Sequence, residues 1–433
     1  GAGMSGYARA ARALGAEVSG SDRGPSSYTE RLAADGVLEA VIGEHDAANV
    51  PAYEDVEVIY SSAVPAENPE RVAARERGLG ERPRAELLAE LTALRPTIAV
   101  AGTHGKTTTS SMLVCALRAA GLEPGWLVGG SVGEGQANAH WSDEPGSWLV
   151  VEADESDRSM LKLDVDVAVL TNVELDHHAT FGSLAEVREA FRAFLARAGT
   201  AIVVWDRPEL LELASGAGPQ VLAYDVADVE LAGGGSTFRW RGHEVALAVP
   251  GAHNALNATA ALEAARLAGA DEARAVAGLA DFKGAGRRFQ LLGTTAAGAV
   301  VYDDYAHHPT EVEATLAGAR TLGPGRLVAV FQPHLFSRTA MFARQFGAVL
   351  GGQADVTVVL DVYPARERAE DHPGVSGLLV AQAAADAADG SPVYWLPSFA
   401  DAEPVLKGLL QTGDVCVVMG AGDVDELARR LVA

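Results

Sequence analysis

The chain has 433 residues, of which 48% are hydrophobic and 21% charged, a composition typical of a globular protein with two or three domains. Its formal net charge of −24 excludes a general basic surface, so nucleic acid is not expected as a partner. It has no apolar run long enough for a membrane span, no basic-then-apolar signal at its start and only two cysteines. We therefore expect a cytoplasmic protein without disulfides or cysteine-based metal sites.

The first predicted element is a glycine turn that leads into a helix. Residues 1–6 match G-x-G-x-x-G, a helix is expected at Tyr7–Leu14, and a strand at Glu17–Gly20 ends in Ser21 and Asp22. This is the dinucleotide fingerprint, which alone indicates a phosphate near a helix start without identifying the nucleotide. No strand precedes Gly1, where this fold has its first strand, so that strand is expected to be missing from the sequence.

A second strand and helix complete the first predicted domain, residues 1–95. The strand Val56–Ser61 ends at Ser61 and Ser62, a helix begins at Arg84, and Leu94-Arg95-Pro96 is interpreted as a hinge.

The most informative pattern is a strand, a glycine loop and a helix at residues 98–120. The apolar strand Ile98–Ala101 leads into Gly102-Thr-His-Gly-Lys-Thr107, where backbone N–H groups converge at the helix start. Lys106 adds a positive charge and Thr107 a hydroxyl for a metal, so we predict a phosphate loop that binds ATP. Val100 stands where the usual loop has glycine, which makes this a compact variant. The alternative is an ordinary turn with a surface lysine.

The predicted central domain, residues 96–289, alternates strands with helices, as in a mostly parallel sheet. Its further strands are expected at residues 148–152, 167–171 and 201–205, and its further helices at 184–196, 254–268 and 272–280.

Polar clusters follow these strands, at the sheet edge where ligands bind in open α/β folds. Glu152 ends one strand and is predicted to hold Mg²⁺, whereas Asp157 fits an acidic capping loop. After the next strand, His177 stands near Glu174 and Asp176 and is predicted to bind a metal or a phosphate oxygen. The following His178 is interpreted as structural.

Two further segments of the central domain have the residue types of a nucleotide site. His253, Asn254 and Asn257 open a helix, and their spacing permits either helix capping or recognition of a base edge. Arg287 and Arg288 follow a Gly-x-Gly turn, from which an arginine could reach a triphosphate.

A third α/β domain is predicted at residues 290–433. Strands are expected at residues 300–303, 327–331, 356–360, 393–396 and 415–419, and a helix at 310–319. Polar residues follow two of the strands, Asp303–Pro309 and Gln332–Arg338. Histidine, arginine and acid at both strand ends indicate one shared site.

Ten segments, in this order, resemble the Mur ligases of bacterial cell-wall synthesis, and together they span essentially the whole chain. They are residues 1–6, 19–22, 101–109, 152–157, 171–177, 253–257, 286–290, 303–311, 331–334 and 361–364.

The resemblance implies an α/β protein with an N-terminal Rossmann-like UDP-sugar domain, a central P-loop ATPase-like domain and a C-terminal Rossmann-like domain. The nearest branch is the one that joins L-alanine to the lactyl carboxylate of UDP-N-acetylmuramate through an acyl phosphate. ATP and Mg²⁺ are then the expected cofactors, with two ions and Mn²⁺ as a substitute, in a monomer or weak homodimer.

The resemblance also implies roles for individual residues. Lys106, Glu152, His177, Arg288 and His307 are the implied catalytic residues, with Arg288 and His307 on the γ-phosphate side and His307 or a nearby carboxylate as base for the amine. ATP is expected at Gly102, Thr103, His104, Gly105, Lys106, Thr107, Thr108, His253, Asn254, Asn257, Arg288 and Asp304, with Asp304 at the ribose. The UDP-sugar is expected at Gly1, Gly3, Met4, Ser5, Gly6, Ser21, Asp22, Ser61 and Ser62. Metal ions are expected at Thr107, Glu152 and His177, and the amino acid at His334 and Arg338.

One position departs from the family pattern. Many relatives have arginine after Gln-Pro-His, where this chain has Leu335. That arginine helps to bind the amino-acid carboxylate, so His334 and Arg338 would have a larger part in binding it here. The main alternative is a Mur-type ligase that adds a preformed peptide, although Glu155-Ser-Asp157 favours the alanine enzyme. An NAD-linked oxidoreductase would not use Lys106, and a non-catalytic nucleotide-binding protein would not need the full set of Lys106, Thr107, Glu152 and His177.

Overall fold

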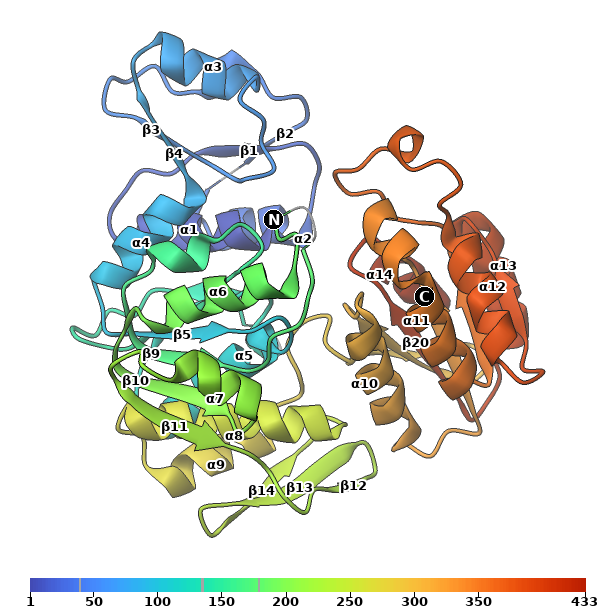
Figure 1. Cartoon of the computed structure of the whole chain (residues 1–433). Coiled ribbons are helices and arrows are strands. Elements are labelled where there is room, and N and C mark those ends of the chain that lie inside the picture. Colours follow the sequence, from blue (N-terminus) through green and yellow to red (C-terminus); the bar gives the residue numbers. More distant parts are fainter. Residues whose placement is uncertain (39, 134–135, 178–179) are drawn as a thin grey trace. The chain divides into compact units, whose positions relative to one another are not determined.

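The computed structural model describes the whole chain except residues 39, 134–135 and 178–179, so His178 lies outside the described residues. Internal contacts divide the chain into two compact units. The first comprises Gly1–Asp225 and Asn257–Gly278, and the second Val226–Leu256 and Leu279–Ala433. The predicted first domain and most of the central domain thus belong to one unit, and the predicted third domain lies within the other (Figure 1).

The N-terminal part of the first unit contains two small parallel sheets. β1 pairs with β2 and β3 with β4, each as a two-stranded parallel sheet. The elements are α1 (Ala2–Ala13), β1 (Gly20–Asp22), α2 (Ser27–Ala34), β2 (Ala40–Ile42), η1 (Ala47–Asn49), β3 (Glu57–Tyr60), α3 (Pro69–Glu76), β4 (Gly80–Pro83) and α4 (Arg84–Ala93).

The predicted glycine turn at residues 1–6 is wrong in one respect, because α1 already begins at Ala2 and not at Tyr7. The glycines serve close packing inside this helix. A Cβ on Gly3 would lie 2.7 Å from Arg84 Nη1, and a Cβ on Gly6 would lie 3.3 Å from Ala139 Cβ. The glycine spacing therefore reflects how closely α1 approaches its neighbours.

The centre of the first unit is a seven-stranded sheet with the order β11-β10-β9-β5-β8-β6-β7, in which only β7 is antiparallel to its neighbour. Its strands are β5 (Thr97–Ala101), β6 (Gly125–Leu127), β7 (Ala139–His140), β8 (Leu149–Glu152), β9 (Val165–Leu170), β10 (Ala198–Trp205) and β11 (Gln220–Tyr224). The helices of this part of the chain are α5 (Lys106–Ala119), η2 (Ser159–Lys162), α6 (Leu184–Leu195), α7 (Pro208–Ala214), α8 (Ala252–Leu267) and α9 (Glu272–Ala280). Of the last two, the first unit contains the residues Asn257–Gly278. The four helices predicted here, now α5, α6, α8 and α9, match to within two residues at each end.

Alternating strand residues place the core on both faces of this sheet. One buried cluster joins Ala99, Val151 and Ala168 to residues of α4, α6 and α7, and Figure 1 shows α6 and α7 across one face. In the register of the strands, Val100 pairs with Glu152 and Ala101 with Leu170. The carboxyl ends of β8, β5 and β9 therefore lie side by side, which places the residues that follow them at one edge.

The second unit contains a six-stranded sheet with the order β15-β16-β20-β17-β18-β19 and helices on both faces. Residues of α10, α11 and α12 form the core on one face, and residues of α13 and α14 the core on the other. A three-stranded antiparallel sheet β12-β13-β14 belongs to the same unit. The elements are β12 (Glu230–Ala232), β13 (Gly235–Trp240), β14 (His243–Leu247), β15 (Gln290–Thr294), β16 (Val300–Asp304), α10 (Pro309–Arg320), β17 (Arg326–Phe331), α11 (Phe336–Gln353), β18 (Val356–Val359), η3 (Ala369–Asp371), α12 (Gly377–Ala387), β19 (Val393–Trp395), α13 (Phe399–Leu409), β20 (Asp414–Met419) and α14 (Asp425–Val432).

Among the described residues, no helix combines the length and the apolar character that crossing a membrane would require.

Gly347 and Gly351 of α11 allow α12 to approach this helix closely, and Gly352 on the same helix serves as a control. A Cβ on Gly347 would lie 2.3 Å from Ala383 Cβ, whereas a Cβ on Gly352 would meet nothing within 4 Å. We expect Gly347→Ala to lower the unfolding free energy of this unit by about 1–3 kcal/mol through overpacking. Gly352→Ala should raise it by about 0.5–1 kcal/mol, because alanine favours an exposed helix. Thermal denaturation of both variants measures this, and equal effects would contradict the packing seen here.

Candidate active site

The loop after β5 has a conformation that only glycine tolerates at two positions. Gly102 has φ +139°, and a Cβ there would lie 2.0 Å from Thr171 Oγ1. Gly105 has φ +83° at the start of α5, and a Cβ there would lie 2.6 Å from Asn257 Oδ1. The positive φ angles and the close neighbours together explain both glycines of the predicted phosphate loop.

The segment after β9 braces this loop. Thr171 Oγ1 donates to His104 O at 2.6 Å, and His104 N donates to Asn172 Oδ1 at 2.8 Å. Thr103 N donates to Asn172 O at 3.1 Å, and Thr103 Oγ1 accepts from Glu174 N at 2.9 Å. The loop is thus fixed by hydrogen bonds, as expected for a site that must be preorganised around a phosphate group.

Lys106 lies at the start of α5 with its ammonium surrounded by acceptors. Its Nζ donates to Gly102 O at 2.5 Å and to Glu155 Oε2 at 2.8 Å. Burial of the ammonium works to lower the pKa of Lys106, but Glu155, with Asp154 and Glu152, outweighs it and raises this pKa above its ordinary value. The lysine is therefore charged at neutral pH, as phosphate binding requires.

Two of the predicted metal ligands lie close to the loop in the chain or in the sheet: Thr107 is in the first turn of α5, and Glu152 ends β8, the strand beside β5. Glu152 ends β8, and its Oε1 accepts the backbone N–H of Gly129 at 2.6 Å. Thr107 follows Lys106 in α5 with 8% of its surface exposed. A hydroxyl and a carboxylate beside a phosphate loop are the hard oxygen ligands that Mg²⁺ prefers, so these residues fit that ion.

His177 has a left-handed backbone conformation, with φ +55°. Its backbone N–H donates to Asp176 Oδ1 at 2.7 Å, and its Nε2 lies 3.3 Å from Glu155 Oε1. A strained histidine held by two acids is consistent with a functional position. The sequence predicted His177 but did not indicate its contact with Glu155.

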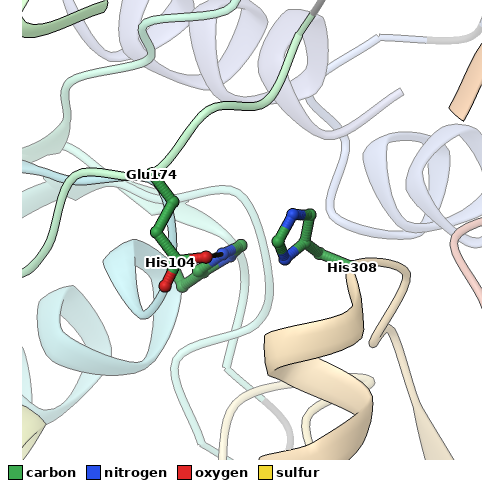
Figure 2. Close-up of side chains that lie close together, drawn as sticks. All are labelled: His104, Glu174 and His308. Carbon is green, nitrogen blue, oxygen red and sulfur yellow. Dashed lines mark ion pairs between the residues drawn. The ribbon is translucent and has the colours of Figure 1, made fainter. Parts of the chain in front are cut away.

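His104 and Glu174 form a pair at the side of the loop. Their Nε2 and Oε2 atoms lie 3.5 Å apart, and Figure 2 draws both side chains. His308, the third residue drawn, belongs to the second unit and directly precedes α10. The predicted ATP residue His104 thus has a carboxylate partner in its own unit.

The residues predicted either to cap a helix or to recognise a base edge lie in the first turns of α8. Asn257 contacts the loop at Gly105, while Asn254 Nδ2 donates to Pro250 O at 2.7 Å. His253 precedes Asn254 on the exposed side of the helix. Asn254 therefore stabilises the helix start, though it is not the N-cap, and the proximity of Asn257 to the loop favours a nucleotide role for that residue.

The N-terminal part contains a cavity of about 570 Å³, lined by Arg23, Gly43, Glu44, His45, Pro65, Glu67, Asn68 and Pro69. Beside it, Ser21 Oγ donates to Glu70 at 2.7 Å, and Asn49 Nδ2 donates to the same carboxylate. Burial works to raise the pKa of Glu70, but the hydrogen bonds from Asn49, Ser21 and His45 outweigh it and hold this pKa below its ordinary value.

The other predicted UDP-sugar residues lie in two kinds of surroundings. Ser5 is buried against Asn138, and Met4 packs at the edge of the core. Ser61 and Ser62 directly follow β3, where Ser61 Oγ accepts the backbone N–H of Ala63. Arg23, His45, Asn68 and Glu70 were not predicted, and their only sequence signal is that they lie near the ends of short strands or helices.

A second cluster forms at the carboxyl ends of β16, β17 and β18. Glu311 Oε2 accepts the backbone N–H of His307 at 3.0 Å, and the His307 ring meets the His334 ring edge-on at 5.9 Å. His334 stacks on Tyr363 at 5.8 Å, and its Nδ1 lies 3.1 Å from Nη1 of the buried Arg338. The expected shared site of the third domain is thus formed by its own residues, with Tyr363 and Glu311 as members that the sequence motifs contained but did not assign.

Leu335 lies between His334 and α11 with φ +69°, a strained value for leucine, and only 6% of its surface is exposed. Its backbone N–H donates to Tyr363 O at 2.9 Å. At this position the chain therefore contributes a backbone anchor and an apolar side chain instead of a charge.

The two arginines after the Gly-x-Gly turn have different surroundings. Arg287 is engaged by Asp303 at 3.1 Å and by the carbonyl oxygens of Gly420 and Gly422, so it is structural. Arg288 lies 3.8 Å from Glu311 and over the Tyr305 ring.

Both carboxylate oxygens of Asp304 accept backbone N–H groups, from Phe289 and Ala306. Burial raises the pKa of Asp304 to about 6. These bonds fix the chain directly before β15 and directly after β16, and the predicted ribose contact stays a prediction.

Comparison with protein families matches almost the whole chain. Residues 1–95 match the Mur ligase family catalytic domain, residues 100–265 the Mur ligase middle domain, and residues 287–422 the Mur ligase glutamate ligase domain.

Individual relatives agree with these matches. The chain is 44% identical to a UDP-N-acetylmuramate–L-alanine ligase of Mycobacterium sp. (strain JLS), covering 100% of this chain and 93% of the relative. It is also 44% identical to the enzyme of the same name from Rubrobacter xylanophilus, of which it covers 98%. Among solved structures, the UDP-N-acetylmuramate-alanine ligase MurC of Thermotoga maritima is similar with a TM-score of 0.83 and 27% identity, covering 100% of this chain and 96% of that one. A murein peptide ligase of Psychrobacter arcticus gives a TM-score of 0.72 and 25% identity, again with 100% and 96% coverage.

Proposed function

Because the chain belongs to the Mur ligase family, we propose that it is the ligase that joins L-alanine to UDP-N-acetylmuramate at the expense of ATP. The products are UDP-N-acetylmuramoyl-L-alanine, ADP and phosphate. The observation that carries the proposal is the braced glycine loop, with Lys106 at its end and with Glu152 at the end of the neighbouring strand β8. Relatives with 44% identity over the whole chain supply the substrate class.

The chemistry explains why these residue types are needed. A carboxylate has no good leaving group, so its direct condensation with an amine is blocked, and transfer of the γ-phosphoryl group to it gives a reactive acyl phosphate. ATP, which donates the phosphoryl group, and the carboxylate, which accepts it, are both anionic. Lys106 and the N–H groups of the loop must therefore screen their repulsion and hold the phosphates in line for transfer. Bound Mg²⁺, held by Thr107, Glu152 and His177, would supply further neutralisation of the transferred group.

The second step needs a neutral amine next to the acyl phosphate. We place the L-alanine carboxylate on Arg338 and His334, which lie together in the second unit. His307, with Nδ1 held 2.9 Å from Tyr305 O and its backbone N–H on Glu311, is the proposed base for the ammonium proton. Arg288 is proposed to approach the γ-phosphate.

The sugar nucleotide is assigned to the N-terminal part of the first unit, where the cavity near His45 follows the ends of β1 and β2. Two metal ions, replaceable by Mn²⁺, a cytoplasmic location and a monomer or weak homodimer complete the proposal.

One assay tests the function. Phosphate release should require UDP-N-acetylmuramate, ATP, Mg²⁺ and L-alanine together, and omission of any one should abolish it. The similarity to a murein peptide ligase makes a preformed tripeptide the competing acceptor. Turnover with the tripeptide and none with L-alanine would reject the proposal in favour of that activity.

Arg338→Lys tests the amino-acid site. Lysine keeps the charge but loses the planar fork of arginine that binds a carboxylate through two hydrogen bonds. We expect the KM for L-alanine to rise about 10- to 100-fold, with the KM for ATP little changed. Arg344→Lys, at an exposed position of the same helix, is the control and should leave both constants unchanged. Equal changes in the two KM values would show that Arg338 does not act on the amino acid.

A further inference from the structure

Glu155 is a buried carboxylate to which the roles above give no task. It lies in the loop after β8, with only 1% of its surface exposed. Its two oxygens lie 2.8 and 3.2 Å from Lys106 Nζ, and Oε1 also lies 3.3 Å from His177 Nε2. One acid thus connects the lysine proposed for ATP to the histidine proposed for the metal.

The hydrogen bonds of Lys106 show what a phosphate group would have to replace. An ammonium has three N–H donors, and Lys106 Nζ has three kinds of acceptor around it: Gly102 O at 2.5 Å, Thr103 O at 3.3 Å and the Glu155 carboxylate. The two carbonyls belong to the loop that Thr171 and Asn172 brace. The Glu155 side chain is therefore the acceptor that a phosphate oxygen can displace from Lys106.

We propose that Glu155 is a positioning residue that competes with a phosphate oxygen of ATP for Lys106. The proposal rests on the proposed function and deepens it by assigning Glu155 to the nucleotide site. When a phosphate oxygen accepts the N–H of Lys106 in place of Glu155, the Glu155 carboxylate keeps its contact with His177, because a buried carboxylate needs a hydrogen-bond donor. Arrival of the nucleotide on Lys106 is thereby coupled to the orientation of His177.

The central test replaces Glu155 with glutamine, which has the same shape and no charge. Calorimetric titration with ATP in the absence of Mg²⁺ should give a Kd about tenfold lower than that of the wild type, since a neutral acceptor competes less well than a carboxylate. At the same time kcat of the complete reaction should fall about tenfold or more, because Lys106 and His177 lose the charged carboxylate that orients both of them. Tighter ATP binding with slower turnover is the combination that structural damage does not produce.

Two further variants separate competition from the general effect of a negative charge. Asp154→Asn removes a neighbouring charge that also acts on Lys106, but Asp154 Oδ1 accepts the Ser156 N–H, so this variant should lower the Kd for ATP clearly less than Glu155→Gln does. Glu155→Asp keeps the charge but shortens the reach by one methylene, about 1.5 Å. It should therefore bind ATP more tightly than the wild type, as Glu155→Gln does. Melting temperatures of all variants monitor the fold.

Three outcomes would overturn the proposal: Glu155→Gln binding ATP no more tightly than the wild type, Asp154→Asn tightening binding as much, or an unchanged kcat in Glu155→Gln. Failure of the proposed function looks different, because then the wild type itself would not bind ATP in the same titration.

Discussion

Lys106→Ala is expected to lower kcat/KM for ATP at least about a thousandfold. The ammonium is the cation that the loop holds at the proposed phosphate site, and a methyl group replaces neither its charge nor its hydrogen bonds. The change also leaves the buried Glu155 carboxylate without its closest cation, so the melting temperature should fall. Steady-state kinetics with saturating UDP-N-acetylmuramate and L-alanine measure the first effect, and thermal denaturation the second.

The control for this substitution is Lys162→Ala. Lys162 pairs with Glu86 at 3.3 Å, but both side chains are more than 40% exposed, and such surface pairs contribute little. Its kinetics should match those of the wild type. If Lys106→Ala stayed folded and kept more than about a tenth of the activity, the loop would not have the role in phosphoryl transfer that we propose.

The sequence could predict those parts of the site that depend only on the order of residues within one short segment. An apolar run before Gly102 and a lysine at the helix start define strand, loop and helix without reference to the rest of the chain. The same holds for Glu152 and His177, because β8 and β9 both run parallel to β5, which lies between them, so the residues at their carboxyl ends share an edge of the sheet. Their placement needed only the rule that ligands bind at the carboxyl ends of strands.

The parts that could not be predicted depend on contacts between distant segments. Nothing local indicates that Glu155 bonds to Lys106, 49 positions away, or that Tyr363 stacks on His334. The predicted helix start at Tyr7 was wrong for the same reason. Glycine spacing suits both a tight turn and a closely packed helix, and the partner Arg84 that decides between them is remote in sequence.

Gly102→Ala is expected to abolish ATP binding and to lower the unfolding free energy of the first unit by about 2–4 kcal/mol. The new Cβ would lie 2.0 Å from Thr171 Oγ1 and 3.1 Å from Asn172 N, while φ stays at a strained +139°. Thr171 must then move, and the bond by which its hydroxyl holds His104 O is lost. The phosphate loop therefore loses its brace together with its shape.

The control is Gly146→Ala, at φ +76° with nothing within 4 Å of the new Cβ. It should cost about 1 kcal/mol from backbone strain alone and leave the Kd for ATP unchanged. The double variant Gly102→Ala/Thr171→Ala removes the hydroxyl that the Cβ meets. It should recover part of the stability that Gly102→Ala loses, although Thr171→Ala by itself is destabilising. A double-mutant cycle without coupling, or a Gly102→Ala protein that binds ATP as the wild type does, would show that the close approach of Gly102 to Thr171 does not shape the loop.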